Sequence, residues 1–319
     1  MKIVILDAAT LGADIDLSPV GALGDMTVFE GTAEGEISTR LADADVAVVN
    51  KLKMNETTLN GAEKLKIICV TATGYDNIDI AYCASRGIAV CNVPAYSTDS
   101  VAQVTLAMAL SLTTHLFAYR THVTSGAYTA GGVANCLVPV YHELSSLTWG
   151  VVGGGGIGRR VAEVAKAMGC RVLMCRKQPE TVFEGVDLDT LCREADIISL
   201  HVPLTDQTRG MINKDRIRAM KKGAILINVA RGAVADEAAL AEAIESGHLG
   251  GLGVDVFERE PLCADHPYYR IMNRENVCLT PHMAWGAFEA RARCVSIVAE
   301  NIKAFFAGER KNRVFKSPN

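Results

Sequence analysis

Short apolar runs recur along the chain, and most of them are followed by a stretch with the residue spacing of a helix. In the first hundred residues these runs predict buried strands at 3–6, 46–49, 66–70 and 88–91, with helices at 34–42 and 78–86. Strands that alternate with helices are typical of a parallel sheet covered by helices on both faces. Pro94 ends the last of these strands, so we expect the first unit to close there.

The same alternation resumes at residue 148. It predicts strands at 148–152, 171–174, 196–200, 224–228, 251–256 and 277–280, with helices at 159–168, 188–194, 214–220 and 237–246. A last helical pattern, 286–307, runs past this second unit, so we expect the two units to share it. The sequence therefore predicts an α/β protein of two doubly wound parallel-sheet domains, 1–98 plus 287–319 and 99–286. A small-molecule site is expected in a cleft between them.

The stretch between the two units has a different pattern. Residues 98–121 keep helical spacing with few charges, and a helix that is apolar nearly all round is a buried one. It could cross between domains or form a subunit interface. Residues 125–139 are rich in glycine and weakly patterned, which predicts a loop.

A glycine-rich turn, T-W-G-V-V-G-G-G-G-I-G, follows at 148–158. Gly153, Gly155 and Gly158 match G-x-G-x-x-G between a predicted strand and a predicted helix. In such a turn the first glycine allows a tight bend, the second lets a pyrophosphate approach the backbone, and the third lets helix and strand pack closely. We therefore predict dinucleotide binding here; the alternative is a structural strand–turn–helix without a ligand.

Composition narrows the class of protein. The chain has 319 residues, 49% of them hydrophobic and 21% charged, with a net charge of −4. Neither nucleic acid nor an acidic membrane surface is an expected partner. No apolar run reaches membrane-spanning length, and the N-terminus fits a first strand better than a signal peptide. The ten cysteines include no C-x-x-C pair, so we expect reduced thiols in the cytoplasm and no metal site.

One candidate residue for chemistry is Arg231, in I-N-V-A-R-G-A-V-A-D-E-A-A-L (227–240). It lies just past a predicted strand, at the edge of a parallel sheet where ligands bind. Its forked donors suit a planar carboxylate. The alternative is an arginine that caps nearby carbonyl groups.

Two further motifs follow neighbouring strands. In G-V-D-V-F-E-R-E-P-L, Asp255 and Glu260 offer carboxylates that can bind an amide or orient an imidazole. In L-T-P-H-M-A-W, His282 is a natural general acid or base near neutral pH. Taken singly, Glu260 could be a solvated loop residue and His282 a loop histidine with a structural partner.

Taken together, these motifs resemble the D-isomer-specific 2-hydroxyacid dehydrogenases. The resemblance covers nearly the whole chain and includes A-T-G-Y-D-N (72–77), N-V-P (92–94), H-V-P-L (201–204), 228–240, 255–261 and T-P-H (280–282). Residues 50–51, 72–75, 92–98 and 100–103 look most like the glycerate dehydrogenase, or hydroxypyruvate reductase, group. The resemblance implies a Rossmann cofactor domain inserted in a flavodoxin-like substrate domain.

The resemblance also implies roles for the candidate residues. His282 would give a proton to the alkoxide formed from a 2-oxo acid, Glu260 would hold the imidazole, and Arg231 would bind the carboxylate and carbonyl oxygen. It implies substrate contacts from Lys51, Thr73, Gly74, Arg231 and His282. It implies cofactor contacts from Thr105, Gly153, Gly155, Gly156, Ile157, Gly158, Arg176, Lys177, His201, Val202, Pro203, Thr208, Val229, Ala230, Arg231, Asp255 and His282, with Asp255 on the nicotinamide carboxamide.

The sequence departs from the family pattern at two places. Members specific for NAD usually carry an acid after the second strand of the cofactor domain, but here that strand ends M-C-R-K, with Arg176 at the acid's position. Because an arginine accommodates the 2′-phosphate, we predict NADP, with NAD as the alternative. The basic pair could instead be solvated. Residues 135–141 lack the aromatic-rich pattern of some hydroxypyruvate reductases, which leaves the substrate open.

The function that follows is reduction of hydroxypyruvate or glyoxylate to D-glycerate or glycolate, by a homodimer. The apolar helix at 101–116 and the habit of the family favour the dimer. One alternative is a nicotinamide-sensing corepressor, because the carboxy-terminal binding proteins share the Arg, Glu and His set, although they carry extensions for partners. The other alternative is a dehydrogenase for a larger D-2-hydroxy acid or for 3-phosphoglycerate.

Overall fold

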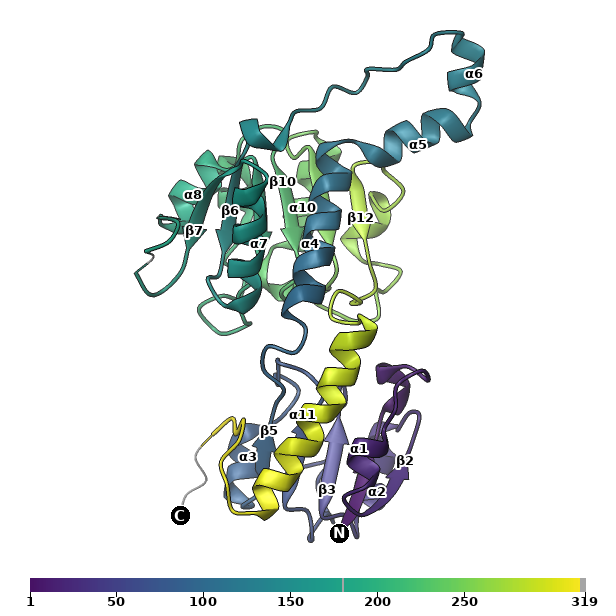
Figure 1. The fold of residues 1–319 in the computed structure, drawn as a ribbon, viewed down its shortest axis with the longest axis vertical. Coiled ribbons are helices and arrows are strands. Elements are labelled where there is room, and N and C mark those ends of the chain that lie inside the picture. Colours follow the sequence, from purple (N-terminus) through teal and green to yellow (C-terminus); the bar gives the residue numbers. More distant parts are fainter. Residues whose placement is uncertain (180, 316–319) are drawn as a thin grey trace. The chain divides into compact units, whose positions relative to one another are not determined.

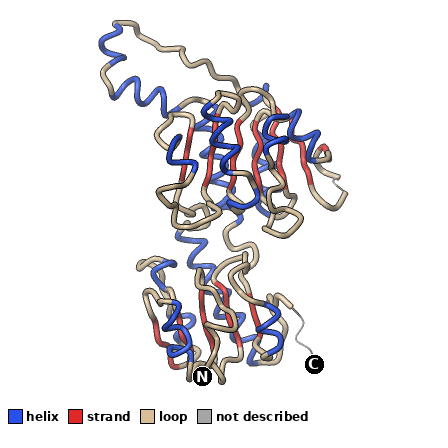
Figure 2. Tube along the Cα trace, turned by 180° about the vertical axis from the view of Figure 1, so that it is seen from behind, coloured by secondary structure: helices blue, strands red, loops and turns tan. Residues whose placement is uncertain are grey.

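Each of the two units of the chain is built around one parallel sheet (Figure 1). This computed structural model describes residues 1–179 and 181–315. Unit 1 combines Met1–Ser97 with the segment from Gly286 onward, and unit 2 is the continuous stretch Thr98–Trp285. In both units helices cover the sheet on its two faces (Figure 2). The predicted α/β class with two doubly wound parallel sheets is confirmed.

The sheet of unit 1 has the order β2-β1-β3-β4-β5, which is the doubly wound order of flavodoxin-like folds. Its strands are β1 (Lys2–Ile5), β2 (Asp25–Val28), β3 (Val46–Val49), β4 (Ile67–Val70) and β5 (Ala89–Cys91). All side chains of the central β3 and β4 are buried, because helices cover both faces of a parallel sheet. Apolar and polar residues therefore do not alternate along these two strands, which appear in the sequence as continuous apolar runs.

Short helices and one long helix cover this sheet. They are η1 (Ala8–Leu11), α1 (Ser18–Gly21), η2 (Glu34–Glu36), α2 (Ile37–Leu41), α3 (Ile80–Ser85) and α11 (Phe288–Phe306). The buried side chains of α2 and α3 pack on one face of the sheet. Helix α11 packs against α1 and β4. The Asp79 carboxylate caps α3 by accepting from the Tyr82 N–H, which is why this helix begins two residues later than expected.

The sheet of unit 2 has the order β12-β11-β10-β9-β6-β7-β8. Its strands are β6 (Thr148–Val152), β7 (Arg171–Cys175), β8 (Glu184–Gly185), β9 (Ile197–Leu200), β10 (Ile225–Asn228), β11 (Gly251–Val254) and β12 (Val277–Leu279). Counted from β6, this is the doubly wound dinucleotide-binding order with one additional strand. The strand order reverses at β6 and β9, so the turn after β6 lies at the point where such folds bind ligands.

The helices of unit 2 divide between two cores. One core joins the sheet to α4 and α7, and the other joins it to α8, α9 and α10. The elements are α4 (Thr98–Thr113), α5 (Leu116–Thr124), α6 (Ala127–Gly131), η3 (Leu144–Ser146), α7 (Gly156–Ala167), α8 (Leu188–Glu194), α9 (Lys214–Ala219), η4 (Gly232–Val234), α10 (Glu237–Glu245) and η5 (Pro267–Arg270). The buried helix expected after residue 98 is thus α4, and it lies in unit 2's own core.

The single helix expected over 98–121 is wrong, because the chain bends between α4 and α5. His115 adopts the left-handed conformation with φ 51°. Just before it, the hydroxyls of Thr113 and Thr114 donate to the carbonyls of Ala109 and Leu110, a contact that bends helices. Within the described chain no single helix is long and apolar enough to cross a membrane; α4 and α5 reach that length and hydropathy only as a pair bent by 61°.

Several other elements were not predicted, among them one helix and two strands. Helix α6 lies inside the segment expected to be a loop at 125–139. Strands β2 and β8 also lacked a signal, because both are edge strands whose side chains are mostly exposed. An edge strand forms where a neighbouring strand offers hydrogen bonds, and periodicity does not record that neighbour.

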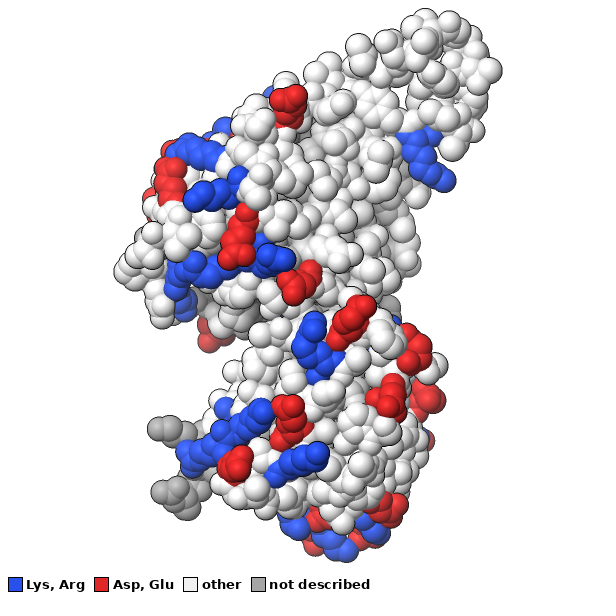
Figure 3. Space-filling model, viewed as in Figure 1, with Lys and Arg blue, Asp and Glu red and all other residues white. Residues whose placement is uncertain are grey.

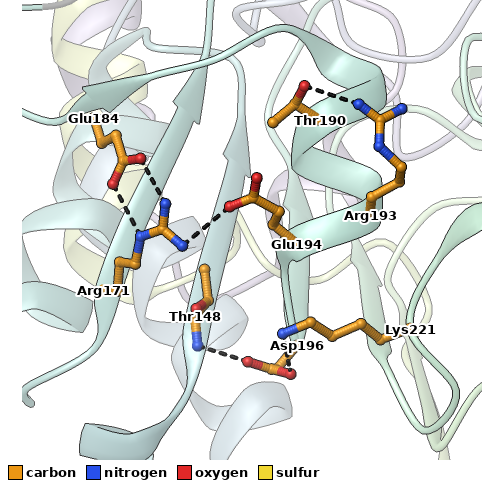
Figure 4. Close-up of polar contacts among 8 residues, drawn as sticks. All are labelled: Thr148, Arg171, Glu184, Thr190, Arg193, Glu194, Asp196 and Lys221. Atoms are coloured by element: carbon orange, nitrogen blue, oxygen red, sulfur yellow. Dashed lines mark hydrogen bonds and ion pairs between the residues drawn. The ribbon is translucent and has the colours of Figure 1, made fainter.

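Polar side chains fix β8 to the sheet at the end where β7 begins (Figure 4). The Arg171 guanidinium makes two bonds to the Glu184 carboxylate, at 2.9 and 2.6 Å, and a third to Glu194 at the end of α8. The Asp196 carboxylate accepts from the Thr148 N–H at 2.8 Å and so ties the start of β9 to β6. These contacts lie at the amino ends of the strands, which leaves the carboxyl ends for ligands.

Candidate active site

The candidate catalytic residues lie where three neighbouring strands of unit 2 end. Arg231 follows β10 and His282 follows β12, and Asp255 follows β11 between them. Parallel strands bring their carboxyl ends to one edge of a sheet, so the topology gathers the three motifs that the sequence left far apart.

The imidazole of His282 meets the carboxylate of Glu260. The ring Nδ1 lies 2.9 Å from Oε1 and 2.8 Å from Oε2, and both side chains are more than two-thirds buried. Nδ1 therefore carries the proton that faces the carboxylate, and Nε2 is the ring atom that can give or take a proton. This contact, over 22 residues of sequence, fixes the orientation of the ring, as a general acid or base requires.

The backbone of His282 is also held in an uncommon conformation. Its φ is 53°, in the left-handed region, and its N–H donates to the carbonyls of Asp255, at 2.8 Å, and Thr280, at 3.0 Å. A left-handed residue other than glycine persists only when its surroundings fix it. The chain here fixes the direction in which the imidazole leaves the backbone.

The carboxylate of Asp255 provides much of that fixation. It is fully buried and accepts from the Thr280 hydroxyl at 2.6 Å and from the N–H groups of Met283, at 2.8 Å, and Ala284, at 3.0 Å. Asp255 thus binds the loop on both sides of His282. The structure gives this residue a role in positioning His282 that the sequence did not reveal; its predicted contact with the nicotinamide carboxamide stays a prediction.

Arg231 is placed by a tight turn at the end of β10. The buried Asn228 side chain donates to the Arg231 carbonyl at 2.9 Å and accepts from the Ala230 N–H at 3.0 Å. A methyl group on Gly232 would overlap the backbone of Phe257 and Glu258, so only glycine lets the Glu260 loop lie this close. The Arg231 guanidinium donates to the Ala230 carbonyl at 2.8 Å. This contact is of the kind that the alternative interpretation of Arg231, as an arginine that caps carbonyl groups, predicted.

The glycine turn after β6 shows the close packing that the motif predicts. Gly153 has φ 106°, and a methyl group there would lie 2.7 Å from the His201 carbonyl oxygen. A methyl group on Gly158 would overlap the Gly153 carbonyl oxygen. Both positions require glycine for the fold itself, with or without a ligand.

Gly155 is different, because among residues 1–179 and 181–315 none beyond its chain neighbours lies within 4 Å of a methyl group placed on it. Its backbone is extended, and no side chain caps α7, which begins at Gly156 and continues through Ile157. Uncapped N–H groups at a helix start beside open space are what a pyrophosphate requires.

Arg176 and Lys177 follow β7, next to the glycine turn. The Arg176 side chain crosses Gly154, since a methyl group on that glycine would lie 2.8 Å from Arg176 Cδ. Its guanidinium donates to the Gln178 side chain at 3.0 Å, and the Lys177 ammonium donates to Gln207 at 2.6 Å. Both of these partners are neutral amides.

His201 lies at the end of β9 with its ring inside the structure. Its Nε2 lies 3.0 Å from the Ser199 hydroxyl, which also accepts from Trp149 Nε1 at 3.0 Å. Burial lowers the pKa of His201 to about 3, so the ring is neutral at pH 7. Its buried Nδ1 has no hydrogen-bond partner in the described part of the chain.

Other residues in the predicted cofactor set mainly shape the backbone. The Thr208 hydroxyl donates to the Pro203 carbonyl at 2.6 Å and accepts from the Thr205 N–H, which closes the loop that begins at Val202. Val229 and Ala230 are buried in the turn after β10.

Thr105 is fully buried in α4, where its hydroxyl donates to the Val101 carbonyl. Its predicted contact with the cofactor stays a prediction.

Comparison with known protein families agrees with the family that the motifs resemble. A family model described as the NAD binding domain of D-isomer specific 2-hydroxyacid dehydrogenases matches residues 106–284, more than half of the chain. The chain belongs to this family. The match lies within unit 2, which carries the glycine turn and the His282–Glu260 pair.

Full-length relatives agree with this assignment. A hydroxypyruvate reductase of Blautia hydrogenotrophica is 33% identical, over 99% of this chain and 100% of its own. The structure of a D-lactate dehydrogenase from Aquifex aeolicus, complexed with NAD and lactic acid, is 31% identical with a TM-score of 0.88, and each chain is covered completely. An acyclic imino acid reductase in complex with NADPH and D-Arg is 28% identical over 99% of this chain and 100% of its own, with a TM-score of 0.86. The chain is an oxidoreductase of 2-hydroxy acids.

Unit 2 of this dehydrogenase fits a nicotinamide dinucleotide. The open space at Gly155, the uncapped start of α7 and the unpartnered His201 Nδ1 are features that the fold alone does not explain.

Unit 1 holds the predicted substrate residues on two loops at the carboxyl edge of its sheet. Lys51 follows β3 and is exposed. Thr73 follows β4 with Gly74, and its hydroxyl donates to the Val93 carbonyl at 2.8 Å. The Thr73 carbonyl accepts from the Asn92 side chain at 2.7 Å, so the backbone of this loop is fixed from the next strand.

Two residues that fix the Lys51 loop escaped the sequence analysis. The buried Asp7 carboxylate accepts from the N–H groups of Asn50, at 2.9 Å, and Lys51, at 2.8 Å. From the other side, Asn77 donates to the carbonyls of Asn50 and Leu52. Burial raises the pKa of Asp7, while these backbone donors and the Lys51 charge oppose the rise. The position of Asp7, an acid directly after an apolar strand, was the signal in the sequence that could have indicated this role.

Proposed function

We propose that this dehydrogenase reduces a small 2-oxo acid, hydroxypyruvate or glyoxylate, to D-glycerate or glycolate. The observation that carries the proposal is the contact of His282 Nδ1 with the Glu260 carboxylate, beside Arg231 on the ligand edge of the sheet. An oriented imidazole and an arginine with forked donors are the two groups that reduction of an ionised oxo acid requires.

A bound reduced nicotinamide would supply the hydride that adds to C2. The protonated His282 gives its Nε2 proton to the carbonyl oxygen, so that the alcohol forms without a free alkoxide. The Glu260 carboxylate holds the imidazole ring through Nδ1 during this transfer, so that Nε2 keeps its direction. Arg231 binds the substrate carboxylate and carbonyl oxygen and stabilises the negative charge that develops there. His282 then takes a new proton from solvent.

We propose that the Lys51 and Thr73–Gly74 loops complete the recognition of the substrate carboxylate. Asp7 and Asn77 fix the first loop, and Asn92 fixes the second, so their amides and the Lys51 ammonium need little reorganisation. A small 2-oxo acid has few polar atoms, and the amides of these two loops can bind those of its carboxylate.

We propose NADPH as the preferred cofactor, with NADH as the alternative. The Arg176 side chain lies across the glycine turn, at the position of the family's acid, and a guanidinium there suits a 2′-phosphate because its forked donors can bind two phosphate oxygens. The NADPH bound to the imino acid reductase noted above belongs to a chain of similar fold, as does the NAD bound to the lactate dehydrogenase.

Kinetics with both cofactors test these proposals. We expect wild type to turn over hydroxypyruvate or glyoxylate with a higher kcat/KM for NADPH than for NADH, and Arg176→Asp to reverse the order. Arg193→Asp, a change of an exposed arginine on α8, is the matched control. Preference of wild type for NADH would refute the role of Arg176. Cofactor binding without turnover of any 2-oxo acid would favour the corepressor alternative.

We also propose a homodimer formed through the arm, defined here as residues 116–142. Seven of its apolar side chains are each more than half exposed, namely Leu116, Val123, Val133, Leu137, Val138, Val140 and Tyr141. Arg120 is the only Lys, Arg, Asp or Glu in the arm, and the arm is nearly free of charge in Figure 3. An apolar surface of this kind marks an interaction site. Light scattering should show a dimer that Leu137→Asp weakens.

We place the protein in the cytoplasm, where thiols are kept reduced. All ten cysteines lie in the described part of the chain, and each is free. Burial raises the pKa of Cys69, Cys83 and Cys294, so these thiols stay protonated and unreactive.

A further inference from the structure

A buried carboxylate outside the proposed reaction holds the Glu260 loop. Glu237 is the first residue of α10, and its side chain is only 9% exposed. Its Oε1 accepts from the Glu258 N–H at 3.0 Å, and its Oε2 lies 2.7 Å from His266 Nε2. Neither Glu237 nor His266 was singled out by the sequence analysis.

The bonding of His266 shows which group donates. Its Nδ1 accepts from the Tyr268 N–H at 3.1 Å, so the ring proton is on Nε2 and points at Glu237. The ring is 5% exposed and lies against Tyr268 and Phe257, with centroids 4.7 and 5.9 Å away. Glu237 therefore receives one hydrogen bond on each of its two carboxylate oxygens.

The loop that Glu237 holds is the one that carries Glu260. Glu258 lies two residues before Glu260, and the Glu260 carboxylate itself accepts from the Phe257 N–H at 3.1 Å. On its other side, the backbone of Phe257 and Glu258 rests on Gly232. The loop is thus fixed between the glycine beside Arg231 and the carboxylate of Glu237.

We propose that Glu237, oriented by His266, is a positioning residue that sets the Glu260 carboxylate against the His282 ring. This inference rests on the proposed acid–base role of that pair. Glu237 binds the backbone of the loop and does not touch the reacting atoms. When it is lost, the loop can move, and displacement of a catalytic group by about 1 Å can cost ~10²-fold in rate.

Two variants remove this support in different ways. Glu237→Gln offers one acceptor to two donors, so one of the two bonds must fail. His266→Asn keeps a side chain that can cap η5 at Tyr268 but is too short to reach Glu237. Glu242→Gln is the matched control, because Glu242 lies on the same helix, is exposed and pairs with Lys214 at 2.6 Å. Glu260→Gln is the reference for complete loss of the carboxylate.

The readouts are the pH dependence of kcat/KM for reduction and NMR titration of the His282 ring in free protein labelled at histidine. The His282 signal is identified from its absence in His282→Gln. We expect both positioning variants to lower kcat ~10- to 10²-fold, with an unchanged KM for the cofactor. In both, the pH above which activity falls should move in the direction seen for Glu260→Gln, as should the midpoint of the ring titration. Glu242→Gln should match wild type.

Other outcomes separate the two proposals. If Glu260→Gln moves the pH profile but neither positioning variant does, Glu237 supports only the fold and this inference is wrong. A lower melting temperature with a wild-type profile would lead to the same conclusion. If Glu260→Gln itself leaves the profile and the titration unchanged, the acid–base pair is wrong, and the role of Glu237 falls with it.

Discussion

The glycine turn allows a test that separates binding of a cofactor from support of the fold. Apart from its chain neighbours, no described residue lies within 4 Å of a methyl group on Gly155, and its φ of −75° and ψ of −172° are open to alanine. Gly155→Ala should therefore leave the free energy of unfolding unchanged or raise it by ~0.4–1 kcal/mol, because alanine restricts the unfolded chain.

The same methyl group should obstruct a pyrophosphate. A hydrogen-bonded phosphate oxygen lies about 2.7–3.2 Å from a backbone nitrogen, within the space that the methyl carbon would fill. We expect Gly155→Ala to weaken binding of NADPH at least ~10-fold, which is about 1.4 kcal/mol. Titration of NADPH fluorescence measures this loss, and thermal unfolding without cofactor measures the stability.

Gly158→Ala is the comparison, because its methyl group would overlap the Gly153 carbonyl oxygen. Overpacking of this kind costs ~1–3 kcal/mol, so this variant should melt several degrees lower without cofactor. Wild-type affinity for NADPH in Gly155→Ala would refute the assignment of the turn to the pyrophosphate. An equal loss of stability in both variants would refute the view that Gly155 faces open space.

Three further predictions concern single side chains. His282→Ala should lose ~10²–10⁴-fold in kcat while still binding cofactor, because the alkoxide lacks its acid; near-wild-type kcat would exclude that role. Arg231→Lys should not restore the kcat/KM lost in Arg231→Ala, because a point charge lacks the forked donors; wild-type kinetics in the lysine variant would contradict this. Burial lowers the pKa of His201 to about 3, so between pH 6.5 and 3 only the unfolded chain takes up this proton, and stability present above pH 6.5 is lost as pH falls. His201→Gln should reduce this loss by up to ~1.4 kcal/mol per pH unit, as urea unfolding across that range would show.

The sequence by itself determined the class of fold and the family. Strands buried on both faces appear as continuous apolar runs, and the requirement for glycine at Gly153 and Gly158 is local, so both signals survive without a structure. Arg231, Glu260 and His282 were singled out because each follows a strand, and parallel strands end at one edge. What the sequence recorded was therefore periodicity and local backbone geometry.

The tertiary structure decided which residues support that edge. The Asp255 carboxylate binds the Thr280 hydroxyl before His282 and two backbone N–H groups after it, and Glu237 with His266 holds the loop of Glu260. Each of these contacts joins residues 21 or more positions apart, and buried carboxylates are chosen by the donors that the fold brings to them. The bend at His115 likewise followed from hydroxyl–carbonyl contacts that helical spacing does not encode. Partners of this kind exist only once the chain has folded, so no pattern along the sequence could name them.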